Sequence, residues 1–272
     1  MQEEIEKLRN QGKSYRQIAQ ILGIAKTTVE YRLTKYQGDS RWEPLNEWQQ
    51  QLIYGSLLGD ASLIKYKDKR PSRQGWYVLQ FAHGEKQLDY LKFKHKILCS
   101  TRKILRRERT SFGKTGILYS FGFAHRPFLS ELHKITHKNG RKTVSTEWLE
   151  KLSELGLAFW FQDDGHTTMS GRKRKDGTHT QHVARIATNG FAEPEINIIL
   201  EYFINKWDLK FHKVRGDHGI SIGIRCNAAK RFIDLIAPHL YLSYKSFKDT
   251  MNVGLELRKH HGPSKESTTR SK

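Results

Sequence analysis

Ile53-Tyr54-Gly55-Ser56-Leu57-Leu58-Gly59-Asp60-Ala61 is the stretch that decides the fold, because a second stretch like it begins 104 residues later. That second stretch is Leu157-Ala158-Phe159-Trp160-Phe161-Gln162-Asp163-Asp164-Gly165. Each is an apolar helical run that ends in an acidic residue followed by a small one. A helix this apolar is buried on most of its faces, and a carboxylate at its end is costly to bury without a partner. We therefore expect two helices packed side by side, with Asp60 and Asp164 brought together.

A metal ion is a common partner for such carboxylates, and hard divalent cations such as Mg²⁺ prefer oxygen ligands. We expect Mg²⁺, with Mn²⁺ as a substitute. The candidate ligands are the residues at the two motif ends, namely Asp60, Ala61, Asp163 and Asp164. Asp164 is favoured over its neighbour Asp163 because it aligns with Asp60. A single Asp at a helix end is more often a cap or a surface carboxylate, but the repeated context favours catalysis.

Two glycines, Gly55 and Gly59, lie four residues apart and so on one face of the first helix. Glycine costs about 1 kcal/mol relative to alanine inside a helix. Two of them on one face suit a helix whose backbone approaches another closely. The second motif has Phe159 and Asp163 at the aligned positions, so the two helices are not equivalent where they cross.

The order of predicted elements also repeats. Residues 47–146 and 147–258 each predict a helix, two strands, a helix, two strands and a helix, an αββαββα unit in an α+β fold. Lys245 follows Lys142 by 103 residues, almost the offset between the two motif carboxylates. Residues 38–46 predict a linker and the basic residues 259–272 a disordered tail. The chain is therefore predicted to contain a duplicated unit.

The composition points to a polyanionic partner. The net charge is +20, and residues 61–115 hold 15 Lys and Arg against 4 Asp and Glu, so the charge is concentrated and nucleic acid is the expected partner. Cys99 and Cys226 lack a Cys-x-x-Cys spacing, which argues against a zinc site and fits a reducing, intracellular compartment, either cytoplasm and nucleoid or an organelle matrix. No apolar run approaches the ~20 residues of a membrane span, and the N-terminus does not resemble a signal peptide.

Residues 1–37 predict a small helical module. Ile5, Leu8, Ile18, Ile21, Leu22, Val29 and Leu33 recur at helical spacing, and Gly23 is suited to end one helix before the next begins. Ala19 is small where two helices would cross. The pattern resembles a helix-turn-helix of the resolvase or transposase type, with residues 25–36 as the recognition helix. The residues expected to face the major groove are Lys26, Thr27, Thr28, Tyr31 and Arg32. A helical hairpin used only for packing is the alternative.

Two units related by a pseudo-twofold axis would place two carboxylates on the axis and a sheet on either side, forming a saddle over duplex DNA. This geometry suits cutting one phosphodiester bond in each strand. Basic strands can enter the major groove, where each base pair has its own donor and acceptor pattern. For any single residue a phosphate contact is commoner than base readout. The candidate readers on the strands and loops are Lys65, Lys67, Arg73, Arg106, Lys114, Arg172, Arg174, Arg185, Lys210, His212, Lys213 and Arg225.

Both motifs resemble the LAGLIDADG signature of homing endonucleases, and the order of elements over residues 47–258 resembles the monomeric, two-motif branch of that family. The resemblance implies Mg²⁺-dependent double-strand cleavage across the minor groove at a long recognition site. It implies that Asp60 and Asp164 bind metal, and that Lys142 and Lys245 lie near the water network of the active site. Gln80 resembles a polar active-site residue of the family, with a counterpart expected near residues 187–189. The helix-turn-helix lies outside the core family fold.

Two alternatives stay open. One is a DNA-binding regulator that keeps the scaffold without cleaving; retention of both carboxylates argues against it. The other is an RNA maturase that assists intron splicing, so intron RNA is a candidate partner beside double-stranded DNA. We expect a monomer without membrane contact. The histidines that could be imagined as metal ligands are expected instead in strands, loops or phosphate contacts; they are His83, His95, His179 and His182.

Overall fold

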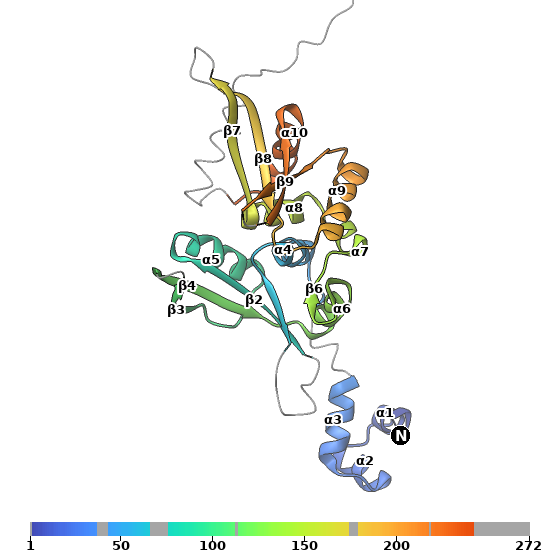
Figure 1. The fold of residues 1–272 in the computed structure, drawn as a ribbon. Helices are drawn as coiled ribbons and strands as arrows, with labels where there is room; N and C mark the ends of the chain where they lie inside the picture. The colour runs from blue at the N-terminus through green and yellow to red at the C-terminus, as the bar shows by residue number, and fades with distance from the viewer. Residues whose placement is uncertain are drawn as a thin grey trace, which may run out of the picture.

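A computed structural model describes residues 2–36, 43–65, 76–111, 114–173, 179–217 and 219–241. The N-terminal module consists of α1 (Gln2–Asn10), α2 (Tyr15–Leu22) and α3 (Lys26–Tyr36). It has a core of its own, formed by Ile5, Ile18, Ala19, Val29 and Leu33. Figure 1 shows it beside the larger body of the molecule.

The turn between α2 and α3 forms as the sequence predicts. Gly23 adopts the left-handed conformation, with φ of 62°, and its N–H bonds the carbonyl of Ala19. Ser14 begins α2 through a capping box with Gln17, which satisfies two N–H groups that would otherwise lack partners. Ile21, one of the apolar residues at helical spacing, is 55% exposed. It lies outside the stripe of α2 that packs on α1 and α3.

The first repeat contains one four-stranded antiparallel sheet in the order β1-β2-β4-β3. Its elements are α4 (Glu47–Leu58), β1 (Ser62–Lys65), β2 (Tyr77–Gly84), η2 (Glu85–Gln87), α5 (Leu88–Ile97), β3 (Leu105–Ser111), β4 (Lys114–Phe123) and α6 (Arg126–Thr136). A short hairpin, β5 (His137–Lys138) with β6 (Arg141–Lys142), follows. Asn46 begins α4 through a capping box with Gln49, at the residue predicted.

The second repeat has the same topology, with the sheet order β7-β8-β10-β9. Its elements are α7 (Thr146–Glu150), α8 (Glu154–Asp164), β7 (Gly165–Lys173), β8 (His179–Ala187), α9 (Glu193–Trp207), β9 (His212–Gly216), β10 (Gly219–Arg225), α10 (Cys226–Ile236) and η3 (Ala237–His239). The predicted duplication of an αββαββα unit is confirmed over the described residues. The single helix predicted over 147–163 is instead α7 and α8, because Gln51 of α4 bonds the backbone at Lys151 and Ser153, in the break between them.

The two motif helices, α4 and α8, pack against each other at the centre, with one repeat on either side (Figure 1). A Cβ atom on Gly55 would collide with the carbonyl oxygen of Gly156, and one on Gly59 would lie 2.5 Å from the Cβ of Asp163. The close approach predicted from these two glycines is confirmed. The large core that surrounds the crossing draws buried residues from both repeats, so each repeat completes the core of the other.

Candidate metal centre and DNA-facing surface

Two carboxylates lie at the ends of the central helices. Asp164 is the last residue of α8, and Asp60 follows α4 by two residues. Burial and the neighbouring Asp163 raise the pKa of Asp60 to about 6. Burial and the charge of Asp60 raise the pKa of Asp164 to about 7. The charge of Asp60 therefore disfavours ionisation of Asp164, and Asp163 acts in the same way on Asp60. An arrangement of this kind is stabilised by a bound cation.

Lys142 lies beside both carboxylates. Its ammonium group donates a hydrogen bond to the carbonyl oxygen of Leu57, in the last turn of α4, at 2.9 Å. Burial lowers its pKa, while the charges of Asp164 and Asp60 act in the opposite direction. Hairpin β5–β6 thus places the Lys142 cation at the C-terminal end of the motif helix, where the helix dipole also favours a positive charge. The predicted counterpart, Lys245, lies outside the described residues.

Asp163 has a different environment from its neighbour. Its side chain is fully buried and forms an ion pair with Lys94 of α5, at 2.5 Å between Oδ1 and Nζ. The Lys94 side chain is also fully buried, and its ammonium lies 4.4 Å from the centroid of the Tyr90 ring. An ion pair buried on both sides links α8 of the second repeat to α5 of the first.

His83 connects this ion pair to Asp60. Its Nε2 lies 3.1 Å from Lys94 Nζ, and its Nδ1 lies 3.2 Å from Gln87 Oε1 and 3.4 Å from Asp60 Oδ2. Burial and the charge of Lys94 lower the pKa of His83 to about 4, so the ring is neutral at pH 7. His83 lies in a strand, as expected, and its ring is buried at the carboxylate cluster.

Ligand atoms of Asp60, His83 and Asp163 lie within 4.8 Å of one another, as the ligands of a metal ion would. The ammonium of Lys94, however, contacts both Asp163 and the Nε2 of His83. Lys94 therefore competes with a metal ion for Oδ1 of Asp163, and the role of Asp163 as a ligand stays a prediction. Asp60 and Asp164 are both carboxylates, the ligand type that a hard divalent cation prefers, and no lysine is hydrogen-bonded to either among the described residues. Ala61 is buried, and its N–H bonds the carbonyl of Ser56.

The strand register identifies the counterpart of Gln80 in the second repeat. Gln80 of β2 lies between Ser62 of β1 and Gly122 of β4. In the other sheet, the residue between His166 of β7 and Gly223 of β10 is Arg185. The sequence-based estimate of residues 187–189 is wrong by two or more residues. Arg185 follows Asp164 by 21 residues, whereas Gln80 follows Asp60 by 20, a difference that the motif offset alone does not reveal.

The same register divides each sheet into two faces. Leu79, Phe81 and His83 of β2 are buried against the helices, so Gln80 belongs to the opposite face. Paired residues of antiparallel strands share a face, which places Arg107 and Arg109 of β3 on the face of Gln80 through Leu118 and Gly116. Both arginines are exposed, and neither is among the residues predicted to read DNA. In the second sheet this face carries Arg185, His212 and Arg225, whose contact with DNA stays a prediction.

Three predicted DNA readers lie on the helix-facing side instead. Arg106 pairs with Tyr119 across β3 and β4 and forms an ion pair with Glu108 at 3.7 Å. Lys213 pairs with Ile222 and bonds Glu193 at 2.7 Å. Lys65 pairs with Tyr77 and lowers the pKa of His133 on α6, although burial lowers it more. Alternation along a strand shows which residues share a face but not which face is covered, and this explains the errors.

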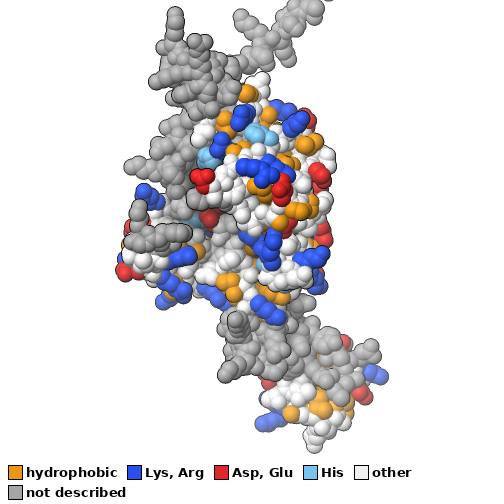
Figure 2. All heavy atoms as spheres, in the orientation of Figure 1, with side chains coloured by type: hydrophobic (Ala, Val, Ile, Leu, Met, Phe, Trp, Pro, Cys, Tyr) orange, Lys and Arg blue, Asp and Glu red, His pale blue; other side chains and the backbone are white. Residues whose placement is uncertain are grey.

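The remaining residues predicted to contact DNA are at least partly exposed, or their side chains lie outside the described part of the structure. Lys26, Thr27 and Lys210 are exposed, and Thr28 is half-buried. Figure 2 shows Lys and Arg side chains over both halves of the larger body on the face in view. Lys67, Arg73 and Arg174 lie outside the described residues. Four more have a described backbone but not a described side chain, namely Tyr31, Arg32, Lys114 and Arg172. The same holds for the side chains of His179 and His182, whereas His95 bonds the carbonyl of Arg102.

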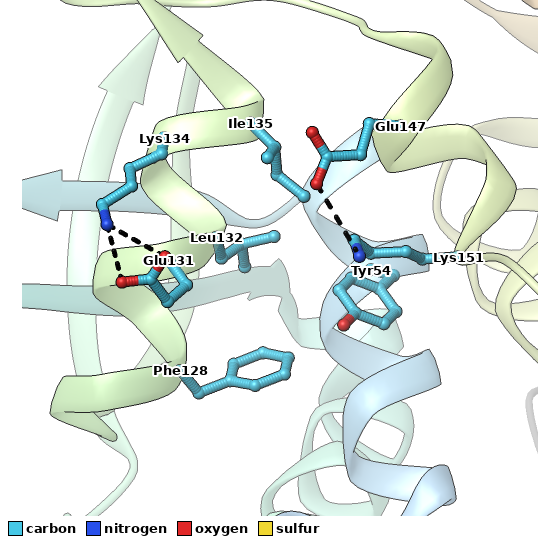
Figure 3. A pocket seen from close by; sticks show the side chains of 8 residues that line it. All are labelled: Tyr54, Phe128, Glu131, Leu132, Lys134, Ile135, Glu147 and Lys151. Atoms are coloured by element: carbon cyan, nitrogen blue, oxygen red, sulfur yellow. Dashed lines mark hydrogen bonds and ion pairs between the residues drawn. The ribbon is translucent and has the colours of Figure 1, made fainter.

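A pocket of about 560 Å³ lies on the other flank of α4, between Tyr54 and the helices α6 and α7 (Figure 3). Its charged lining residues are paired among themselves. Lys134 bonds Glu131 at 2.7 Å, and Lys151 lies 3.9 Å from Glu147. Such a pocket presents no uncompensated charge to a phosphate, so we place the chemistry at the carboxylates.

Comparison with known proteins agrees with this geometry. Residues 50–232 match the model of the LAGLIDADG DNA endonuclease family, and residues 2–35 match a helix-turn-helix domain. Over 211 residues the chain is 27% identical to the cytochrome b mRNA maturase bI2 of Debaryomyces hansenii, covering 75% of this chain and 74% of that protein. It is 32% identical over 135 residues to Protein RecA of Mycolicibacterium flavescens, of which it spans only 30%.

Two further likenesses concern endonucleases. The chain is 25% identical over 175 residues to the probable intron-encoded endonuclease 1 of Wickerhamomyces canadensis, covering 63% of this chain and 69% of that protein. The structure of the homing endonuclease I-WcaI bound to its DNA recognition sequence matches with a TM-score of 0.62 and 22% identity, covering 79% and 91% of the two chains. No helix in the described part of the chain has the length and apolarity to cross a membrane. With both repeats, both motifs and a family match over two thirds of its length, the chain belongs to the LAGLIDADG DNA endonuclease family.

Proposed function

We propose that this protein is a site-specific endonuclease that makes a divalent-metal-dependent double-strand break in DNA. The observation that carries the proposal is the pair Asp60 and Asp164. Two partly buried carboxylates, both with a raised pKa, are a liability in a protein that only binds DNA. They become favourable when a divalent cation lies between them and the phosphates of a substrate.

Asp60 and Asp164 would hold the metal, for which Mg²⁺ is the expected ion and Mn²⁺ a substitute. A bound divalent cation would lower the pKa of a coordinated water and neutralise charge on the leaving oxygen. Lys142 is held by the carbonyl of Leu57 and would stabilise negative charge that develops on the phosphate. Among the described residues no side chain is placed as a dedicated general base, which favours a solvent-linked water as the nucleophile.

The exposed faces of the two sheets would contact the DNA. Gln80 and Arg185 occupy equivalent places nearest the motif ends, and Arg107, Arg109 and Arg225 lie further out. Arginine forms bidentate bonds to guanine and also contacts phosphates. Ile64 and Leu105 are 46% and 47% exposed on the same face, where apolar side chains can contact thymine methyl groups. The helix-turn-helix would add contacts through Lys26 and Thr27.

The proposal is tested with a supercoiled plasmid that carries the uninterrupted form of the locus encoding the protein. We expect a linear product in Mg²⁺ that does not form in EDTA, and mapping of its ends gives the cleavage site. A plasmid carrying the interrupted locus is the matched control, since it separates site-specific cutting from a general nuclease. A plasmid that stays supercoiled in both Mg²⁺ and Mn²⁺ would contradict the proposal.

A maturase is the second candidate, and one observation favours it. The relative with 74% of its length covered is an mRNA maturase, so the similarity spans most of that protein. The same basic faces would then bind structured intron RNA. Splicing of the host intron, measured with and without the protein at low Mg²⁺, distinguishes this candidate. Acceleration of splicing by the Asp164→Asn variant would assign the activity to the scaffold and not to the carboxylates.

A further inference from the structure

The buried residues next to Asp60 in the first repeat differ from those at the equivalent positions of the second repeat, which contains Asp164. In the first repeat, His83 and Lys94 are fully or almost fully buried polar residues between β2 and α5. Arg185 follows Gln80 by 105 residues, and the first residue of α9 follows that of α5 by the same number. This offset equates His83 with Thr188 and Lys94 with Ile199. Ile199 is a fully buried apolar residue of α9, and the hydroxyl of Thr188 bonds the carbonyl of Ile220 at 2.7 Å. An equivalent of the polar chain is therefore missing from the second repeat.

The ends of the two motif helices differ in a way that fits this difference between the repeats. Asp163 of α8 supplies the acceptor for Lys94, and the aligned position in α4 is Gly59, whose missing side chain leaves room for Asp163. A lysine in a core position is tolerated only where its charge is paired and hydrogen-bonded. Gly59, Asp163 and Lys94 thus form one arrangement that has a single copy in the described parts of the two repeats.

The hydrogen bonds assign the tautomer of His83. Lysine ammonium is a donor without acceptor capacity, so Nε2 of His83 accepts from Lys94. In a neutral imidazole the other nitrogen then carries the hydrogen. The Nδ1–H group faces two acceptors, Gln87 Oε1 at 3.2 Å and Asp60 Oδ2 at 3.4 Å. The chain of contacts therefore runs from Asp163 through Lys94 and His83 to Asp60.

We propose that Asp163, Lys94 and His83 are positioning residues that orient the Asp60 carboxylate and serve only one of the two half-sites. This rests on the proposed function, because its consequence concerns the DNA strands. The 3.4 Å contact with Nδ1 of His83 holds one oxygen of Asp60 against the chain and leaves the other free for a metal. Among the described residues Asp164 has no such support, so loss of the chain slows cleavage of one strand more than the other.

The test uses a duplex of the cleaved site with a different fluorophore on each strand. His83→Thr introduces the residue of the second repeat, and we expect the ratio of the two strand-cleavage rates to change by roughly 10- to 100-fold, as for misplaced catalytic groups. His83→Asn keeps an N–H where Nδ1–H lies, and should return the ratio toward the wild-type value. Thr188→Val is the matched control: it loses a buried hydrogen bond, lowers thermal stability, and leaves the ratio unchanged.

An unchanged ratio in His83→Thr, an equal change in Thr188→Val, or failure of His83→Asn to restore the ratio would each overturn the proposal. A second measurement does not depend on cleavage. Imidazole ¹⁵N shifts should report the Nδ1–H tautomer of His83 in the wild type, and a mixture of tautomers in the Lys94→Leu, Asp163→Gly double variant. A wild type with the Nε2–H tautomer would overturn the chain. Absence of wild-type cleavage of either strand would contradict the proposed function alone.

Discussion

Gly55 lies directly against the backbone carbonyl of Gly156 where α4 crosses α8. The contact brings the two motif helices close enough for Asp60 and Asp164 to influence each other. Gly156 precedes the second motif by one residue, so the two motifs do not cross at aligned positions. Close packing at the crossing is therefore a condition for forming the carboxylate pair.

Gly55→Ala should destabilise the protein by about 1–3 kcal/mol, the usual cost of overpacking a core, because the clash is with backbone that cannot rotate away. Urea unfolding followed by circular dichroism measures the change. Gly116→Ala is the matched control, since a Cβ there meets nothing within 4 Å. Equal stability of the two variants would contradict the close crossing.

Asp164→Asn should stabilise the metal-free protein at pH 8. The folded pKa of Asp164 is about 7, against an ordinary value of 3.8, so ionisation above pH 7 costs the folded state more than the unfolded state. Removing the charge should raise the melting temperature in EDTA by roughly 2–4 °C per kcal/mol recovered. The gain should shrink as the pH falls toward 4, where the carboxyl group is protonated in the folded state. Asp217→Asn, at an exposed site, should change neither value.

Metal binding should strengthen as the pH rises from about 5.5 to 8. Protons compete with the cation for Asp60 and Asp164, whose pKa values are about 6 and 7, and the release of protons on binding shifts the equilibrium. Calorimetric titration with Ca²⁺ in two buffers of different ionisation enthalpy measures both affinity and proton release. Affinity that is independent of pH over this range would contradict the paired carboxylate site.

Arg109→Ala should weaken DNA binding more than Arg106→Ala. Arg109 lies on the exposed face with Gln80, whereas Arg106 lies on the helix side and contacts Glu108. If Arg109 contacts a phosphate, its loss should also reduce the salt dependence of log K by about 1. Binding titrations at several salt concentrations, with the two variants compared, make the measurement. Larger losses in Arg106→Ala would mean that the DNA lies on the other face.

The order of helices and strands and the duplication could be predicted from the sequence, because helix ends and buried runs depend on local signals. Asn46 caps α4, Gly23 ends α2, and the apolar run before Asp60 is buried. These features act within a few residues of the chain. The pairing of Asp60 with Asp164 followed from repetition of the motif, which is a signal over the whole chain but needs no knowledge of the sheet register.

The chain through His83, Lys94 and Asp163 could not be predicted in the same way. Each residue has an ordinary reading by itself: a strand histidine, a helix lysine and a motif neighbour. One signal was available, since Lys94 falls at a position of the predicted amphipathic helix that its neighbours Tyr90 and Leu91 mark as buried. A lysine there requires an acid nearby. Choosing that acid required the crossing of α4 and α8.

The sequence also could not predict which of Arg106 and Arg107 lies on the exposed face of the sheet. Neighbouring residues of a strand point to opposite faces, and the alternation of β3 is weak because its exposed residues are polar on both faces. A shift of one residue reverses the assignment. The face is decided by the pairing of β3 with β4, whose buried residues Phe121 and Phe123 mark the core side.

The most direct test of the central claim measures cleavage and DNA binding together for the wild type, Asp60→Asn and Asp164→Asn. The account predicts that both variants bind the cleaved site with nearly wild-type affinity in Ca²⁺, and that neither makes a double-strand break in Mg²⁺. Wild-type cutting by either variant would contradict the assignment of the two carboxylates as the metal-binding pair.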